Sequence, residues 1–210
     1  MNKFRKEISC LIVYWLCCVI CSIAPAYLPA WWLENGTVWT GIIFLSFLYY
    51  KGVRLRMISL LIILAASCLH TIGGHYTFAY VPYGECIGDL FGVARNCYDR
   101  LGHLFCGLLA VPLMDVLLRN RVNPVGTFVL GVLSVMGAAA MYEMFEWWST
   151  TVLDKQTAEV YVAIQGDPWD AQADMLMCFI GTLLSVLIAC FAFRKTEGDE
   201  GVINLFECRK

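Results

Sequence analysis

Charged residues are scarce in this sequence, and their scarcity decides its class. Asp, Glu, Lys and Arg make up 15% of the 210 residues, whereas hydrophobic residues make up 60% and aromatic residues 14%. A soluble domain usually carries about 25% charged residues. The composition therefore excludes an ordinary soluble domain and predicts a membrane protein whose solvent is the lipid bilayer.

The sequence also lacks an excess of positive charge and the cysteine spacing of a structural zinc site. Its formal net charge is -2, which gives no reason to expect a nucleic-acid partner. No two CxxC motifs occur at zinc-site spacing, and most of the 11 cysteines lie in apolar runs, where cysteine acts as a small hydrophobe. Only Cys86, Cys97 and Cys208 lie outside or at the edge of such runs, and a Cys86–Cys97 disulfide stays an open alternative.

Six apolar stretches predict an all-α, six-helix transmembrane bundle. A helix needs about 20 mainly apolar residues to cross a bilayer. The predicted spans cover residues 8–28, 31–50, 57–75, 96–118, 125–148 and 170–193. Together they form one membrane domain, residues 1–195, followed by a polar tail, residues 196–210, which is expected in the cytoplasm.

The first two predicted spans carry the least certain assignments. Ala24, Pro25 and Ala26 resemble the cleavage site of a signal peptide, but the apolar run before them is closer to the length of a true span. The strongly apolar part of the second span covers only residues 37–50. Either its beginning, which includes Glu34, lies in the headgroup layer, or the helix is tilted very little.

The distribution of Lys and Arg predicts the orientation of the bundle. With the N-terminus inside, the outer loops hold only Arg95, Arg100 and Lys155, which leaves 12 of the 15 basic residues on the inner side. Cytoplasmic loops of membrane proteins are enriched in these residues. The pattern therefore predicts that both termini are cytoplasmic.

Histidine and acidic side chains gather at the outer ends of the third to sixth predicted helices. A carboxylate at the bilayer centre costs about 2.5 to 3.5 kcal/mol on insertion scales, so these side chains are expected to face protein rather than lipid. Small residues continue the same faces, such as Gly107 after His103 and Gly181 after Asp174, and small residues allow helices to approach closely. The predicted site has Asp99, Arg100, Glu143, Glu146 and Asp170 as catalytic residues and His70, His103, Asp99 and Asp174 as metal ligands.

The segment NCYDRLGH, residues 96–103, contributes the densest group of polar residues. Asn96, Asp99, Arg100 and His103 are spaced i, i+3, i+4 and i+7, which places them on one face of a helix. Imidazole and carboxylate groups suit a divalent ion such as zinc, iron or manganese. Arg100 could pair with a carboxylate or hold an anionic phosphate.

Three functions remain compatible with this cluster. The first is an enzyme, with or without a metal ion, that acts on a lipid or lipid-linked substrate at the outer leaflet. The second is a proton- or cation-coupled transporter, although Asp115 is the only acid expected below the cluster within the spans. The third is a structural or partner-binding protein whose Asp, Arg and His residues form only an interhelical salt-bridge network.

Four segments resemble the pattern of the DUF2238 family of bacterial inner-membrane proteins. These are HTIGGHYTF (70–78), NCYDRLGH (96–103), YEMFEW (142–147) and QGDPWDAQADM (165–175). The resemblance covers about residues 1–195 and does not extend to the tail. It implies a multi-pass location in the bacterial inner membrane and implies no activity.

Overall fold

A computed structural model describes residues 5–193 and contains nine helices and no strand within that range. The helices are α1 (Arg5–Cys21), α2 (Leu28–Tyr50), α3 (Met57–His75), α4 (Gly84–Phe91), α5 (Tyr98–Leu108), α6 (Ala110–Arg119), α7 (Pro124–Val152), α8 (Lys155–Val162) and α9 (Asp170–Ala192). The all-α prediction is confirmed. The predicted polar tail, residues 196–210, lies outside the described residues.

Four stretches of the described chain are long and apolar enough to cross a membrane. They are α3, the continuous stretch Tyr98–Arg119 that contains α5 and α6, α7 and α9. The first helix, with 17 residues, and α2 are not among these four. The six-span count and the cytoplasmic location of both termini therefore remain predictions.

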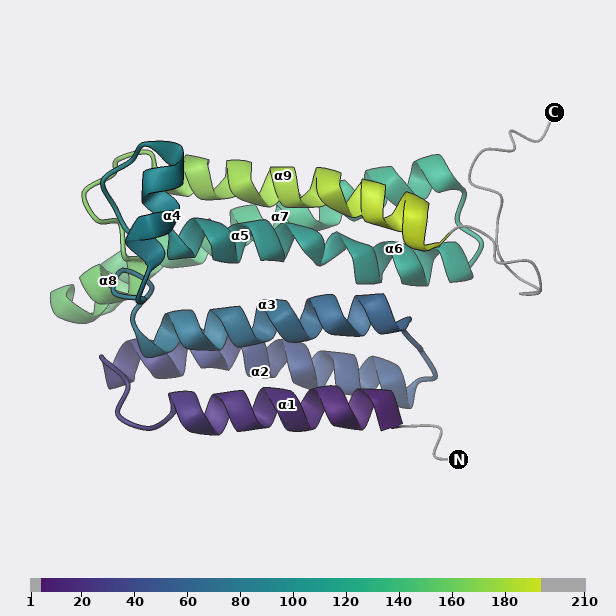
Figure 1. The fold of residues 1–210 in the computed structure, drawn as a ribbon, viewed down its shortest axis with the longest axis horizontal. Helices are drawn as coiled ribbons and strands as arrows, with labels where there is room; N and C mark the ends of the chain where they lie inside the picture. The colour runs from purple at the N-terminus through teal and green to yellow at the C-terminus, as the bar shows by residue number, and fades with distance from the viewer. Residues whose placement is uncertain (1–4, 194–210) are drawn as a thin grey trace.

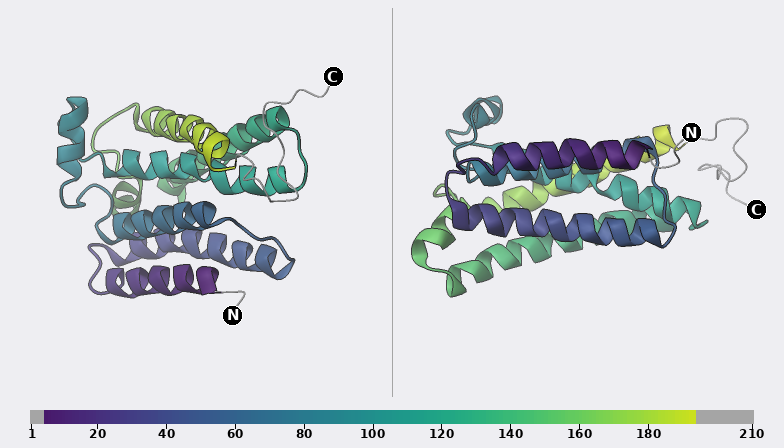
Figure 2. Two further views of the ribbon diagram at one scale, coloured as in Figure 1. Left: turned by 45° about the vertical axis from the view of Figure 1, so that its right-hand side comes forward. Right: turned by 90° about the horizontal axis from the view of Figure 1, so that it is seen from below.

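The long helices run side by side along one axis in two groups (Figures 1 and 2). One group contains α1, α2 and α3, and the other contains α5, α6, α7 and α9 (Figure 1). The beginning of α1 and the end of α9 lie at the same end of the bundle, while α4 and α8 lie at the opposite end (Figure 1). We call this opposite end the α4–α8 end. It contains the end of α3, the beginning of α5, the end of α7 and the beginning of α9.

Proline explains why the first two helices differ from their expected ranges. The first helix ends at Cys21 rather than near residue 28, because Pro25 disfavours helical geometry at Ala24, which has a φ of 49°. The second begins at Leu28, with a proline in its first turn, where a missing backbone N–H costs nothing. As a result Glu34 lies well inside α2 and is only 2% exposed, and its place in the headgroup layer stays a prediction.

The fourth predicted helix is divided, and both long loops contain a helix. The chain between α5 and α6 breaks at Leu109, where Pro112 cannot donate the hydrogen bond that an unbroken helix would direct to the carbonyl of Leu108. The connection between the third and fourth predicted spans contains α4, and the connection between the fifth and sixth contains α8, each of eight residues. These two short helices close the α4–α8 end around the polar residues.

Helices α5 and α9 pack closely through small residues, as the sequence pattern predicted. A Cβ atom added to Gly107 would collide with the backbone carbonyl of Cys178, and one added to Gly181 would collide with that of Leu104. The Ser185 hydroxyl donates a 3.1 Å hydrogen bond to the Gly107 carbonyl across the same contact. This crossing holds the two helices that carry most of the predicted site at a fixed separation.

Candidate functional site

Asp99, His103 and Asp174 bring their donor atoms together between α5 and α9. One atom from each of the three side chains lies within 4.8 Å of the other two. Two ligands of one ion are separated by at most about 4.4 Å, twice the 2.2 Å upper ligand distance of a typical zinc site. The three groups therefore need to move little to share one ion, and all three are buried.

Several polar atoms in this group have no hydrogen-bond partner among the described residues. They are Oδ1 of Asp174, Nδ1 of His103 and Oε1 of Glu143. Asp174 is only 2% exposed and His103 only 5% exposed. A buried polar atom without a partner costs about 1 to 3 kcal/mol, so three such atoms in one place leave capacity to bind a ligand.

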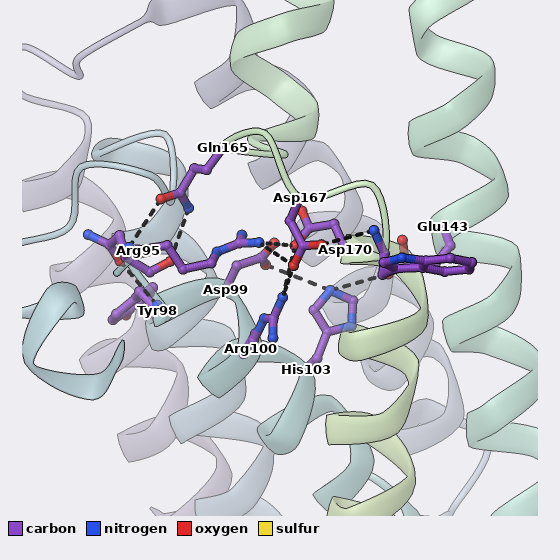
Figure 3. A network of polar contacts seen from close by, with 11 residues as sticks. Arg95, Tyr98, Asp99, Arg100, His103, Glu143, Gln165, Asp167 and Asp170 are labelled. Carbon is purple, nitrogen blue, oxygen red and sulfur yellow. Dashed lines mark hydrogen bonds and ion pairs between the residues drawn. The ribbon is translucent and has the colours of Figure 1, made fainter. Parts of the chain in front are cut away.

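The two predicted catalytic glutamates lie on α7 at the edge of this group. Oε1 of Glu143 is 3.5 Å from Nε2 of His103, which in turn is 3.7 Å from Oδ1 of Asp99 (Figure 3). Glu146 follows one helical turn later and is 9% exposed. Asp99, His103, Glu143 and Asp174 thus form one cluster, which we call the carboxylate–histidine cluster.

Two arginines and two aspartates form a separate network beside that cluster (Figure 3). Nη1 of Arg95 lies 2.5 Å from Oδ1 of Asp170 and 3.2 Å from Oδ2 of Asp167. Nη2 of Arg100 lies 2.6 Å from Oδ2 of Asp167 and 3.5 Å from Oδ1 of Asp170. We call these four residues the arginine–aspartate network. It joins the chain before α5 to the beginning of α9.

Hydrogen bonds and charge shift the ionisation of two members of this network. The pKa of Asp167 lies below its ordinary value, first because the backbone N–H of Trp169 donates to its carboxylate and then because Arg100 lies beside it. Burial alone would lower the pKa of Arg95, but its hydrogen bond to Asp170 and the surrounding carboxylates raise it. Both groups are therefore held in their charged forms.

A third polar group, composed of Glu34, His70 and Tyr142, lies between α2, α3 and α7. Nε2 of His70 lies 2.9 Å from Oε2 of Glu34, and the Tyr142 hydroxyl donates a 3.0 Å hydrogen bond to the same oxygen. The Tyr142 ring makes edge contacts with both imidazoles, and its centroid lies 6.2 Å from the ring centroid of His70 and 6.1 Å from that of His103. The structure therefore places His70 beside Glu34, across the Tyr142 ring from His103.

Comparison with known proteins gives a family but no solved structure. Residues 7–195 match the family described as "Predicted membrane protein (DUF2238)". The chain belongs to the DUF2238 family. It is 37% identical over 120 residues to "Inner membrane protein YjdF" of Escherichia coli (strain K12), and this match covers 55% of the present chain and 56% of the relative. The match thus spans little more than half the length of either protein, and no solved structure matches.

The family match agrees with a bacterial inner-membrane location. Its description is that of a membrane protein, its relative in Escherichia coli is named for the inner membrane, and the described chain has four helices long and apolar enough to cross a bilayer. The resemblance to DUF2238 in the sequence is confirmed. All four motifs that carried the resemblance contribute residues to the α4–α8 end.

Sequence reasoning missed Glu34 and Tyr142 in this DUF2238 protein. Glu34 was hidden by its position in the tryptophan-rich beginning of α2, where a headgroup location explained it equally well. Tyr142 was hidden because tyrosine is common near membrane interfaces. The available signal was that Glu34 is an ionisable residue inside a predicted membrane span, which by itself favours a functional or paired position.

Two other polar residues of the predicted cluster have local structural roles. Asn96 precedes α5, so it does not continue the stripe of Asp99 and His103. Its side chain instead donates to the Val81 carbonyl and accepts from the backbone of Tyr98. His75 bonds through Nδ1 to the Cys21 carbonyl, which links the end of α3 to the end of α1. Cys86 and Cys97 are both free in the structure.

Proposed function

We propose that this protein binds a divalent metal ion through Asp99, His103 and Asp174 and uses it in an enzymatic reaction on a lipid or lipid-linked substrate at the outer leaflet. The observation that carries the proposal is the convergence of these three buried donors within 4.8 Å, together with the unpartnered Oδ1 of Asp174. The arginines pair with Asp167 and Asp170 instead of with this group.

The charge of the cluster also favours a cation. Three carboxyl groups, from Asp99, Glu143 and Asp174, surround the single imidazole of His103. Like charges held close together in a buried site destabilise one another unless a proton or a cation lies between them. A divalent ion would supply that compensation and would also give the unpaired Oδ1 of Asp174 a partner. One histidine with carboxylates suits zinc, iron or manganese.

The residues around the three ligands have distinct roles in this proposal. A divalent ion would polarise a carbonyl or phosphoryl oxygen of the substrate as a Lewis acid. Glu143 lies beside His103 without a hydrogen bond to it, so it is placed to accept or donate a proton at the reacting group. Glu146 backs this position one turn along α7, and Asp170 fixes the arginine side chains at the mouth of the site.

The inner half of the bundle supports an enzyme over a transporter. Asp115 is fully buried and accepts hydrogen bonds from the side chains of Arg56, Ser59 and Arg119. Its carboxylate is thus occupied in a helix-joining role. The fully buried apolar side chains of Val111 and Met114 lie between it and His103 along the chain. The described residues therefore offer no continuous line of ionisable groups through the bundle.

The metal content of purified protein tests the proposal directly. We expect about one divalent ion per chain in the wild type and little in Asp174→Asn and His103→Gln, because each substitution removes one of three ligands. Asp154→Asn and His75→Gln are the matched controls. Asp154 caps the beginning of α8, where asparagine is an equivalent cap, and the His75 side chain bonds to Cys21 at the end of α1, away from the three ligands. Both controls should retain the ion.

Reaction with native lipid tests the enzymatic part. Metal-loaded wild type and Asp174→Asn are reconstituted into vesicles of total inner-membrane lipid extract, and the lipids are compared by mass spectrometry. A change in one lipid class that depends on both the metal and Asp174 supports the enzyme. Metal-free wild type overturns the whole proposal, whereas bound metal with no metal-dependent change in the extract overturns only the enzymatic part.

A further inference from the structure

The guanidinium groups of Arg95 and Arg100 converge on one place at the α4–α8 end. Both contact the same two carboxylates, Oδ2 of Asp167 and Oδ1 of Asp170, at distances between 2.5 and 3.5 Å. Two guanidinium groups that contact neighbouring carboxylate oxygens form a binding site for an anion with several oxygen atoms. The oxygens of a phosphate group have the same spacing and charge, and arginine binds them in the same forked geometry.

The arginines have more hydrogen-bond donors than the aspartates satisfy. Nε and Nη2 of Arg95 and Nε of Arg100 are buried and have no partner among residues 5–193. The Arg95 side chain is only 9% exposed, so water does not readily compensate these donors. A purely structural ion pair at this depth would be expected to use its donors, because each unpaired buried group costs about 1 to 3 kcal/mol.

We infer that Arg95 and Arg100 bind a phosphate group of the substrate, and this inference rests on the proposed function of the neighbouring carboxylate–histidine cluster. It narrows the substrate class from lipids in general to phosphate-bearing lipids. The phosphate occupies the donors that Asp167 now takes, together with the unpartnered N–H groups. Asp170 remains in place and keeps the Arg95 side chain oriented.

Asp167 is the member of the network that can leave. Its side chain is 29% exposed, compared with 9% for Asp170. It lies in the α8–α9 connection, after Gly166, whose φ of 80° is accessible to glycine but to few other residues. Asp170 by contrast is the first residue of α9 and is held by that helix. Asp167 thus stands in for the anion while no substrate is bound.

The depth of the arginines matches a lipid phosphate. Arg95 precedes α5, and Asp170 begins α9, so the network lies at the ends of two membrane-length helices, where headgroup phosphates reside. Asp174 follows Asp170 by four residues, about 6 Å deeper at 1.5 Å per residue. A lipid whose phosphate contacts the arginines would therefore extend its remaining groups toward the proposed metal ligands.

Thermal unfolding with inorganic phosphate as the probe tests the inference. The protein is purified in an uncharged detergent, and unfolding is followed by the fluorescence of its seven tryptophans. We expect phosphate, at constant ionic strength set with chloride, to raise the unfolding temperature of the wild type. Arg100→Gln should weaken the apparent affinity for phosphate about tenfold, and Arg100→Lys, which loses the forked geometry, should weaken it less.

Asp167→Asn gives a result that a structural salt bridge does not predict. Removing the competing carboxylate should tighten phosphate binding several-fold, although the protein without phosphate becomes less stable. Asp154→Asn removes the same charge from the same end of the bundle without contacting an arginine, and Arg121→Gln removes an exposed arginine elsewhere. Both controls should bind phosphate as the wild type does. Equal responses of Arg100→Gln, Asp167→Asn and wild type would overturn the inference.

A second pair of probes separates a lipid from free phosphate. Short-chain phosphatidic acid is compared with diacylglycerol of the same chain length, which differs only in lacking the phosphate. Stabilisation by phosphatidic acid alone supports a lipid source, and stabilisation by inorganic phosphate as well supports the shared chemistry. No response to either probe overturns the inference. Metal content is measured on the same Arg100→Gln sample. Loss of phosphate binding with retained metal leaves the proposed function standing. Retained phosphate binding with loss of metal rejects the proposed function and leaves the phosphate site standing.

Discussion

The Tyr142 hydroxyl donates a 3.0 Å hydrogen bond to the Glu34 carboxylate and so joins α7 to α2 across the two groups of helices. Tyr142→Phe should destabilise the protein by about 1.5 to 3 kcal/mol, the range for a hydrogen bond to a charged group. The measurement is the unfolding temperature in detergent. Tyr80→Phe is the control, because Tyr80 is 75% exposed. Equal unfolding temperatures for Tyr142→Phe and wild type would show that this link adds nothing to stability.

The close contact between Gly107 and Gly181 predicts that a methyl group added at this crossing destabilises the protein. In Gly181→Ala the new methyl group would meet the backbone of Leu104, which cannot move aside as a side chain could. We expect a loss of about 1 to 3 kcal/mol from overpacking, measured by thermal unfolding. Gly137→Ala in α7 is the control, since an added Cβ meets nothing within 4 Å there. That variant should be neutral or slightly stabilised, because alanine favours helix.

The carboxylate of Asp115 predicts a stability defect without a functional one. Asp115→Asn removes the charge that Arg56 and Arg119 share, and the loss of a hydrogen bond to a charged group costs about 1.5 to 3 kcal/mol. Arg119→Gln should cost much less, because the Arg119 side chain is 43% exposed. Unfolding in detergent measures both. If the folded Asp115→Asn protein lost bound metal, the ion pairs of Asp115 would not be independent of the carboxylate–histidine cluster.

The depressed pKa of Asp167 predicts a specific acid sensitivity. Because its pKa is lower in the folded protein than in the unfolded chain, its contribution to stability is complete above the unfolded value, about 3.9, and is lost as the pH falls through the folded value. Between pH 6 and about pH 3, the unfolding temperature of Asp167→Asn should therefore fall less than that of the wild type. Identical pH profiles for the variant and the wild type would refute the assignment.

Cysteine labelling tests the predicted orientation. Cys86 is exposed on α4, at the end of the bundle predicted to face outward. A membrane-impermeant maleimide should label Cys86 in intact spheroplasts. Cysteine introduced at Arg121, at the opposite end between α6 and α7, should react only after lysis when Cys86 is replaced by serine. Reversed labelling would place the carboxylate–histidine cluster on the cytoplasmic side.

Local sequence patterns predicted correctly the helices that are defined by a continuous apolar run. The third helix has the expected bounds, Met57–His75, because a polar boundary precedes it and Tyr76 ends it after a continuous apolar run. The packing of Gly107 against Gly181 was also predictable, since small residues recur on the same faces as the acids. Both predictions rest on neighbouring residues in the sequence.

Contacts between distant segments could not be predicted in the same way. Arg100 could pair with any nearby acid, and its actual partner, Asp167, depends on how the α8–α9 connection folds back over α5. Glu34 meets Tyr142 only because α2 starts earlier than its hydropathy indicated. The break at Leu109 follows from Pro112, a local signal that apolar periodicity concealed.

The break at Leu109 separates two mechanical tasks along one membrane crossing. The first piece, α5, is fixed against α9 and presents Asp99 and His103, while the second piece, α6, is anchored by Asp115. A bilayer of different thickness can therefore be matched by lengthening or shortening α6 and its connection to α7, and the donor atoms above the break keep their spacing. Relatives adapted to thicker or thinner membranes should differ in the length of the segment that follows Leu109, and they should keep the length of the segment from Arg95 to Gly107.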